Sequence, residues 1–444
     1  MDAQKNGGQL VKAAPTKELF ISMLTRDLTM NDAIGEFVDN AVDGARALRP
    51  DKNYDGLQID LEVNKDYFAI TDNCGGIDVS LARDYAFRFG RAEGMPSIPG
   101  SIGYFGLGMK RALFKLGTKF IIESRARDSR FVLEVDVKAW QEAEGWQFEF
   151  KEYEENLPEI PEAQRGTKIT VTELDRDVSE SFDLGNFIIK LGIELSFEQL
   201  ININRGLKIL LNGHPLRNRQ LTLLQSNEIK TAYWEHSMHS RHVKIYAGIS
   251  QHDLDYGGWY VFCNDRLVLG PDQTVTTGWG ARSALIPDYC DKFARFRGYV
   301  FFDTEDGSLL PWNTTKNGIV IDAPRFIGIR QRMLSMMDMV IHFLNRLHDD
   351  KKNTYNDDEE SPLERALSAA QNVPLSQIKK EDLHRFFVPP QPIHSPPLGP
   401  DEARISYRKP IEKIEELRKL WHLKSFEQVG SIAFDYFYMS EISG

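Results

Sequence analysis

Cysteine is scarce in this chain, and its scarcity excludes two kinds of scaffold. The 444 residues include three cysteines, Cys74, Cys263 and Cys290, at wide and unpatterned spacing. An odd number at such spacing fits neither a disulfide framework nor a zinc site with four thiolates. We therefore expect a reducing compartment, which indicates a cytoplasmic protein.

Long apolar runs and an excess of positive charge are also missing. The chain has no run of roughly 18 apolar residues that could span a membrane, and its first residues lack the apolar core of a signal peptide. Lys and Arg number 54 against 65 Asp and Glu, a net charge of −11. This acidity argues against binding of nucleic acid over the whole surface, whereas a local basic patch stays compatible with it. No membrane partner is expected.

Hydrophobic periodicity predicts an α+β fold with two folded units. The first, over residues 1–180, begins with helical spacing over 17–49, interrupted by a cap at 29–32, and continues in strands. The second, over 181–348, has a helical start, further strands and a long helix. The expected strands are 57–63, 67–71, 119–125, 131–137, 146–153 and 167–174 in the first unit, and 207–213, 242–249, 259–268 and 297–304 in the second.

The C-terminal part differs in composition from these two units. Residues 349–400 combine a charged stretch, a short helix and a run rich in proline, so we expect a solvated linker. Residues 401–444 regain periodicity, with one short strand at 404–410 followed by two helices. A small helical tail is therefore expected at the end of the chain.

Four polar side chains share one face of the helix expected after the cap. Glu36, Asp39, Asn40 and Asp43 follow one another at i, i+3, i+4 and i+7, with no Lys or Arg between them. Neighbouring carboxylates weaken a bare helix, so this stripe suggests a bound cation or an activated water. Asn40, a neutral oxygen donor, would suit Mg²⁺ that also carries phosphate ligands. A solvated acidic face is the alternative.

A second element is the segment ITDNCGGI, residues 70–77. Here a strand ends in Asp72 and runs into Gly75 and Gly76. A carboxylate at this place can accept hydrogen bonds from a planar amino group, and the glycines allow close approach. An ordinary turn explains the segment equally well when it is taken alone.

A third element is the glycine-rich loop over 88–108, which is too long for an ordinary connection and is therefore expected to be functional or mobile. Gly103, Gly106 and Gly108 precede a helix whose first turn carries Lys110. Free N–H groups at a helix start, together with an ammonium, form an anion site for phosphates. The loop lacks the Gly-Lys-Ser/Thr of a Walker A sequence and the third glycine of a dinucleotide fingerprint.

These elements, followed by RGTKITV at 165–171, resemble in their order the GHKL ATPases: gyrase, the large heat-shock chaperones, histidine kinases and the MutL proteins. EFVDNAVDGA resembles the N box of that superfamily, DNCGGI its adenine box, GYFGLGMK its lid glycine box, and the Gly-Thr pair its last box. The resemblance thus makes the loop over 88–108 the expected lid. The resemblance implies a Bergerat-type α/β sandwich, in which helices cover one face of a mixed sheet. It also implies ATP and Mg²⁺ as ligands.

Roles of single residues follow from the resemblance. It implies that Glu36 is the general base, that Asn40 holds Mg²⁺, that Asp72 accepts from the adenine amino group, and that Thr167 contacts adenine through water. At Cys74 the chain departs from the superfamily, which usually has glycine there. The full set implied for the nucleotide is Asp39, Asn40, Asp43, Asp72, Gly75, Gly76, Ile77, Gly103, Tyr104, Phe105, Gly106, Leu107, Gly108, Met109, Lys110 and Thr167.

The resemblance extends into the second unit and is closest to microrchidia-like and MutL-like ATPases. GWYVFCNDRLVLG at 258–270 is similar to the strand and Asn-Arg signature of their transducer domain, and PWNTTKNGI at 311–319 resembles the loop whose lysine reaches the terminal phosphate. This makes Lys316 the expected phosphate sensor; a plain surface lysine is the alternative. In those families ATP closes the lid and an N-terminal strap onto a second protomer, which implies an ATP-dependent homodimer with residues 1–25 as the strap.

The C-terminal module resembles a ribbon-helix-helix domain. Arg404, Ser406 and Arg408 alternate with apolar residues, so one face of the expected strand would be basic and could bind DNA. A helical hairpin that docks on a partner effector protein, or on the ATPase itself, is the alternative.

The leading functional hypothesis is a Mg²⁺-dependent ATPase that closes as a clamp or switch in DNA transactions or prokaryotic genome defence. A heat-shock-type chaperone and a non-hydrolysing ATP-binding scaffold are the alternatives, although the segment after residue 345 is expected to be too short for a client-binding middle domain. A sensor kinase and a topoisomerase are not expected, because no phosphoacceptor helix precedes the first unit and no cleavage domain follows the second.

Overall fold

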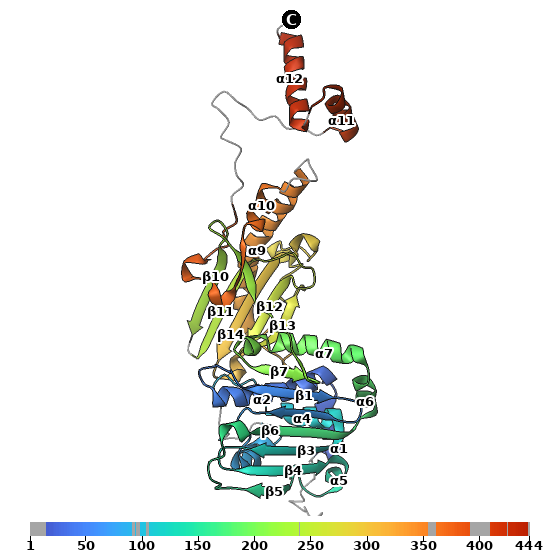
Figure 1. Ribbon diagram of the computed structural model, residues 1–444, viewed down its shortest axis with the longest axis vertical. Helices are drawn as coiled ribbons and strands as arrows, with labels where there is room; N and C mark the ends of the chain where they lie inside the picture. The colour runs from blue at the N-terminus through green and yellow to red at the C-terminus, as the bar shows by residue number, and fades with distance from the viewer. Residues whose placement is uncertain are drawn as a thin grey trace, which may run out of the picture.

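The structure, a computed structural model, places two sheet-based units one after the other along its long axis, with two C-terminal helices at one end (Figure 1). Among the predicted site residues, Tyr104 and Phe105 lie outside the described part of the chain. So do residues 1–14 of the expected strap and 404–408 of the expected strand. The described residues are 15–90, 94, 98–103, 106–238, 240–353, 361–390, 409–423 and 425–442.

The first unit contains an eight-stranded sheet in the order β5-β4-β3-β6-β2-β1-β7-β8. The strands predicted at 57–63 and 67–71 are present as β1 and β2, and they pair antiparallel from Ile59–Asp72 to Val63–Phe68. β7 joins β1 in parallel, which makes the sheet mixed and extends it beyond residue 180. The strands are β1 (Gln58–Val63), β2 (Phe68–Asp72), β3 (Gly117–Arg125), β4 (Arg130–Asp136), β5 (Phe150–Glu154), β6 (Gly166–Leu174), β7 (Lys208–Leu211) and β8 (His214–Pro215).

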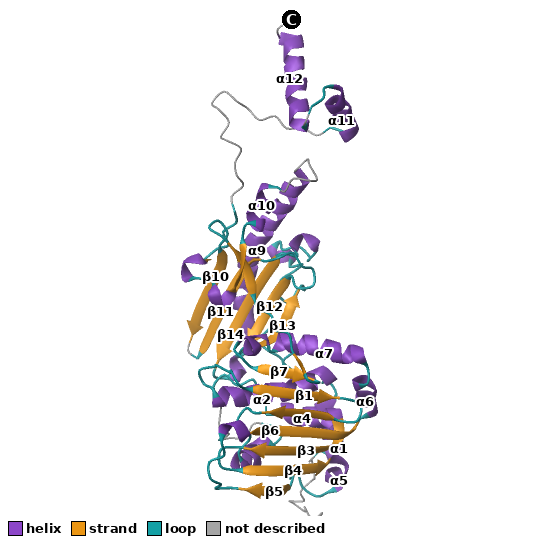
Figure 2. Cartoon of the chain, viewed as in Figure 1, coloured by secondary structure: helices purple, strands orange, loops and turns teal. Residues whose placement is uncertain are grey.

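Helices cover one face of this sheet, as Figure 2 shows, and the strand residues alternate between buried and more exposed positions. α2 begins at a capping box in which Thr29 and Asp32 satisfy each other's backbone N–H groups, and its apolar stripe is buried. α5 was not predicted; Asp136 ends β4 and caps it. The helices are α1 (Lys17–Thr25), α2 (Met30–Leu48), α3 (Val79–Leu81), α4 (Gly108–Leu116), α5 (Val137–Glu142), α6 (Arg176–Phe182), α7 (Gly185–Glu198) and α8 (Leu200–Asn204).

The second unit contains a six-stranded sheet in the order β13-β12-β14-β11-β10-β16, packed against the long helix α9 (Pro324–Asn353). The prediction of one strand over 259–268 is wrong. Asn264 and Asp265 both adopt the left-handed conformation, which these residue types tolerate, and they turn the chain into the hairpin β12–β13. The strands are β10 (Thr231–Met238), β11 (Arg241–Ile249), β12 (Gly258–Cys263), β13 (Arg266–Asp272), β14 (Phe296–Thr304) and β16 (Leu383–His384).

The described part of the expected linker is folded onto the second unit. The short helix α10 (Pro362–Ser368) buries Leu363 and Leu367. β15 (Gln371–Pro374) pairs with β9 (Thr222–Gln225), and β16 pairs with β10. The sequence between residues 361 and 390 therefore contributes to the core, which its mixed composition did not indicate.

The tail forms a helical hairpin of α11 (Ile411–Leu420) and α12 (Phe426–Ile442). Several large side chains on α12 are exposed, among them Phe434, Tyr436 and Phe437. Within the part of the chain that the structure describes, none of the helices has both the length and the apolar character needed to cross a membrane.

Candidate functional site

A cavity of about 540 Å³ lies between α2, the turn at 74–78, the base of the glycine-rich loop, the start of α4 and the loop that carries Lys316. Asp39, Asp72 and Thr167 are not among its lining residues; the latter two border a broader hollow of about 1210 Å³ on the open side of the sheet. The predicted residues that line the cavity are Glu36, Asn40, Asp43, Gly75, Gly76, Ile77, Gly103, Gly106, Leu107, Gly108, Met109, Lys110 and Lys316.

The two predicted catalytic residues meet at this cavity, although 280 positions separate them in the sequence. Lys316 Nζ donates to Glu36 Oε2 at 2.7 Å and to Asp39 Oδ2 at 2.9 Å. Glu36 and Lys316 are 3% and 2% exposed, so this is a buried ion pair between the first unit and a loop of the second. Burial lowers the pKa of Lys316, but the carboxylates of Asp39 and Glu36 outweigh it, so the pKa is raised.

Asp39 faces a buried charge network rather than the cavity. Arg266 Nε lies 2.8 Å from both of its carboxylate oxygens, and Gln199 Nε2 donates to Oδ1 at 2.9 Å. Burial opposes ionisation, but the Arg266 guanidinium and the Lys316 ammonium hold the pKa of Asp39 below its usual value. Asp39 therefore joins the two units through its ion pairs with Arg266 and Lys316, and it does not line the cavity itself.

Three members of this network, Arg266, Glu198 and Gln199, were not predicted as site residues. Glu198 Oε2 forms an ion pair with Arg266 Nη2 at 3.2 Å. Burial raises the pKa of Glu198 to about 8. The sequence contained one signal for such partners, the acidic stripe on α2. A carboxylate on the buried side of a helix requires a cation from elsewhere in the fold.

Asp43 binds the base of the glycine-rich loop. Its Oδ1 accepts from the backbone N–H of Ile102 at 2.8 Å, and its Oδ2 accepts from the N–H of Gly103 and the hydroxyl of Ser101, both at 2.7 Å. Burial raises the pKa of Asp43 in spite of these donors. Asp43 thus fixes the position of the first glycine of the lid box.

The turn after β2 accommodates Cys74 without backbone strain. The left-handed conformations fall on Gly75 (φ 101°) and Gly76 (φ 72°), and Cys74 is not among the residues with positive φ. A Cβ on Gly76 would lie 2.0 Å from the carbonyl oxygen of Arg125, so glycine is required at that position. The Cys74 N–H donates to Asp72 Oδ1 at 2.8 Å, and burial raises the pKa of Asp72 to about 6.

The first turn of α4 borders the cavity and has no side-chain cap. A Cβ on Gly108 would lie 1.9 Å from Glu36 Oε2, so glycine leaves the space that the Glu36 carboxylate occupies. The Lys110 ammonium donates to the carbonyl of Ala86 at 2.9 Å, and burial lowers its pKa to about 8. Uncapped N–H groups beside an ammonium can hold an anion at this end of the cavity.

Asn40 fits the role of a magnesium ligand. Its Nδ2 donates to the carbonyl of Glu36 at 2.8 Å, and its Oδ1 lies 3.5 Å from where a Cβ on Gly103 would stand, so the oxygen faces the lid. Mg²⁺ commonly takes one or two protein oxygens together with phosphate oxygens and waters. Among the described residues no group of three or more His, Cys, Asp or Glu side chains could hold a metal ion, so the fit depends on Asn40.

A comparison with protein families matches the part of the chain that forms most of this site. Residues 28–167 match the family described as histidine kinase-, DNA gyrase B-, and HSP90-like ATPase. The matched segment runs from the cap of α2 into β6 and contains every predicted site residue except Lys316. A search of curated proteins finds no match. The family match supports an ATP-binding ATPase domain of the GHKL type in the first unit.

Proposed function

We propose that this chain is a Mg²⁺-dependent ATPase in which the second unit senses the γ-phosphate through Lys316. The observation that carries the proposal is the 2.7 Å contact between Lys316 Nζ and Glu36 Oε2. It joins the second unit to the residue that the resemblance makes the general base, at the edge of a cavity lined mainly by the segment matched as an ATPase.

The chemistry requires positioning and charge stabilisation more than covalent participation by the protein. Glu36 would orient the attacking water, and N–H groups at the start of α4 would bind phosphate oxygens. Mg²⁺, held by Asn40, would neutralise charge on the triphosphate. In this structure Lys316 contacts the carboxylates of Glu36 and Asp39. A bound γ-phosphate would compete with them for the ammonium, and this would leave Glu36 available as a base. The position of the second unit would then follow the nucleotide state.

ATP affinity should fall as the pH falls through about 6. Asp72 does not line the cavity itself, but its Oδ1 accepts from the N–H of Cys74, which does. Asp72 must be ionised to accept strongly from an adenine amino group that reaches it at this turn, and its raised pKa of about 6 means that it becomes protonated within the mildly acidic range. Asp72→Asn should weaken binding roughly tenfold or more at neutral pH, because a hydrogen bond to a charged acceptor is lost. Titration calorimetry with ATP from about pH 5 to about pH 8 measures both effects. Equal affinity for ATP across that pH range would show that Asp72 does not bind the adenine amino group.

An ATP-dependent homodimer is the assembly that we propose. α1, the described part of the strap, packs against its own unit, with the Lys17 ammonium donating to the carbonyls of Trp140 and Ala143. Leu19 and Met23 on the same helix remain exposed, which favours a partner for this helix. Sedimentation with non-hydrolysable ATP should show a doubled mass at micromolar protein, and a mass unaltered by the nucleotide would contradict the dimer.

For the C-terminal hairpin the exposed side chains favour a protein partner over DNA. α12 contains no Lys or Arg, and Phe434, Tyr436, Phe437 and Tyr438 are exposed along it. The basic face that would bind DNA falls on residues outside the described part.

We keep DNA transactions or genome defence as the proposed setting. Unchanged retention of labelled duplex DNA after deletion of 401–444 would exclude the tail as its binding site. A heat-shock-type chaperone ATPase or a non-hydrolysing scaffold is the second candidate. ATP turnover by the parent chain that is lost in Glu36→Gln would rule out the scaffold.

A further inference from the structure

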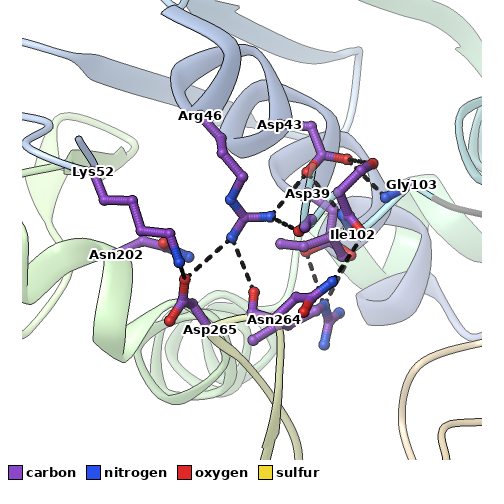
Figure 3. Close-up of polar contacts among 12 residues, drawn as sticks. Asp39, Asp43, Arg46, Lys52, Ile102, Gly103, Asn202, Asn264 and Asp265 are labelled. Carbon is purple, nitrogen blue, oxygen red and sulfur yellow. Dashed lines mark hydrogen bonds and ion pairs between the residues drawn. The ribbon is translucent and has the colours of Figure 1, made fainter. Parts of the chain in front are cut away.

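We propose that Arg46 is a positioning residue that couples the base of the lid, residues 100–103, to the second unit. This inference rests on the proposed function of the cavity as an ATP site. Arg46 lies in the last turn of α2, is 4% exposed and does not line the cavity. Its guanidinium is divided between the two units, with one terminal nitrogen contacting the first unit and the other contacting the second (Figure 3).

The first of these nitrogens supports the lid. Arg46 Nη1 donates to Asp43 Oδ1 at 3.3 Å and to the carbonyl of Gly100. Asp43 in turn accepts from the N–H groups of Ile102 and Gly103. Arg46 therefore contacts the lid base directly and also compensates the buried carboxylate that fixes the first lid glycine.

The second nitrogen contacts the β12–β13 turn of the second unit. Arg46 Nη2 donates to the carbonyl of Asn264 at 2.9 Å and lies 3.5 Å from Asp265 Oδ2. Asn264 also reaches the lid itself, because its Nδ2 donates to the carbonyl of Ser101 at 3.4 Å. Its Oδ1 accepts from the N–H of Thr304 at 2.9 Å, which ties the turn to β14.

Asp265 remains ionised at this junction. Burial opposes its charge, but Arg205 at 2.6 Å and Lys52 at 2.8 Å outweigh burial and lower its pKa to about 2. Arg46 thus lies between two carboxylates, Asp43 on the side of the lid and Asp265 on the side of the second unit. The two terminal nitrogens of Arg46 make four contacts. An ammonium has three donors, whereas these two guanidinium nitrogens carry four N–H groups.

The arrangement couples the two units rather than only stabilising them. The β12–β13 turn and the Lys316 loop belong to the same unit, and each contacts a residue of α2: the turn contacts Arg46, and Lys316 contacts Glu36. A shift of the second unit would change both contacts together. Withdrawal of the turn would leave Arg46 with partners in the first unit alone and would loosen the backbone at 100–103.

The test compares two variants that each remove one cation from Asp265. Arg46→Met also removes the contacts with the lid base, whereas Lys52→Met, at a partly exposed side chain, does not. We expect faster amide hydrogen exchange at Ile102 and Gly103 in Arg46→Met, and parent-like exchange in Lys52→Met, without added nucleotide. Asp265→Asn, a change in the second unit, should also accelerate exchange at these amides. It keeps the proposal testable if Arg46→Met does not fold.

Nucleotide assays separate positioning from general stability. A fluorescent ATP analogue should bind roughly 2- to 30-fold more weakly to Arg46→Met and Asp265→Asn, as expected for coupling carried through a network. The change should appear in KM, with kcat at saturating ATP nearly unchanged, and Arg46→Lys should restore only part of the affinity. Parent-like exchange at 100–103 in both Arg46→Met and Asp265→Asn would overturn the proposal. A parent chain that binds no analogue would instead refute the proposed function, and the exchange result would still decide the coupling.

Discussion

Replacement of Glu36 by glutamine should lower ATP turnover by roughly 10²- to 10⁴-fold, the usual contribution of a positioned general base. Glutamine keeps the size of the side chain and can still accept a hydrogen bond from Lys316, but it cannot take a proton from water. ATP should remain bound, because the variant leaves Asp72 and the N–H groups at the start of α4, the proposed contacts for adenine and phosphate, unaltered. Phosphate release at saturating ATP measures turnover, and calorimetry measures binding.

The matched control is Glu152→Gln, the same chemical change at an exposed position of β5. This variant should retain the parent turnover. Parent-like turnover in Glu36→Gln, with ATP bound, would mean that another group activates the water. Loss of ATP binding in Glu36→Gln would instead show that this carboxylate supports the shape of the pocket, and the assignment of its role would change accordingly.

Replacement of Arg266 by methionine should destabilise the chain by about 3–5 kcal/mol, the cost of removing one partner from a buried ion pair. Asp39 would keep Lys316 as its nearest cation, and Glu198 would lose its contact with the Arg266 guanidinium. Asp39 and Glu198 lie where the two units meet, so the contact between the two units should loosen first. Urea unfolding followed by tryptophan fluorescence measures the change.

The control for this variant is Arg83→Met, which removes an exposed ion pair with Glu155. Exposed ion pairs contribute little to the free energy of unfolding, so this variant should unfold at the same urea concentration as the parent. An Arg266→Met chain as stable as the parent would show that Lys316 alone can compensate Asp39. In that case the charge network would not be what holds the two units together.

Much of the site could be predicted because its parts are local in the sequence. The stripe on α2, the glycine turn after β2 and the glycines before α4 each depend on spacing within a few residues, and the structure brings twelve of their predicted residues to one cavity. The strands β1 and β2 and the helix α4 were predicted for the same reason. The hairpin turn at Asn264 and Asp265 was missed, because the apolar segments on either side of these two residues were interpreted as one strand.

The parallel pairing of β7 with β1 was also beyond sequence reasoning. The 207–213 segment was recognised as a strand, but it was assigned to the second unit, whereas Leu61 and Leu211 lie side by side in the first sheet. Periodicity shows that a segment is a strand; it does not show which edge of which sheet receives the strand. That choice depends on packing between segments far apart in the chain.

The amino-acid sequence by itself determined which face of α2 carries its polar side chains, because 3.6 residues per turn place Glu36, Asp39, Asn40 and Asp43 on one side. Only the tertiary structure decided what each of them does. Glu36 contacts Lys316, Asp39 enters the buried network, Asn40 faces the lid, and Asp43 holds it. The partners arrive from segments between residues 98 and 320, and a helical period contains no information about which of these distant groups will pack against it.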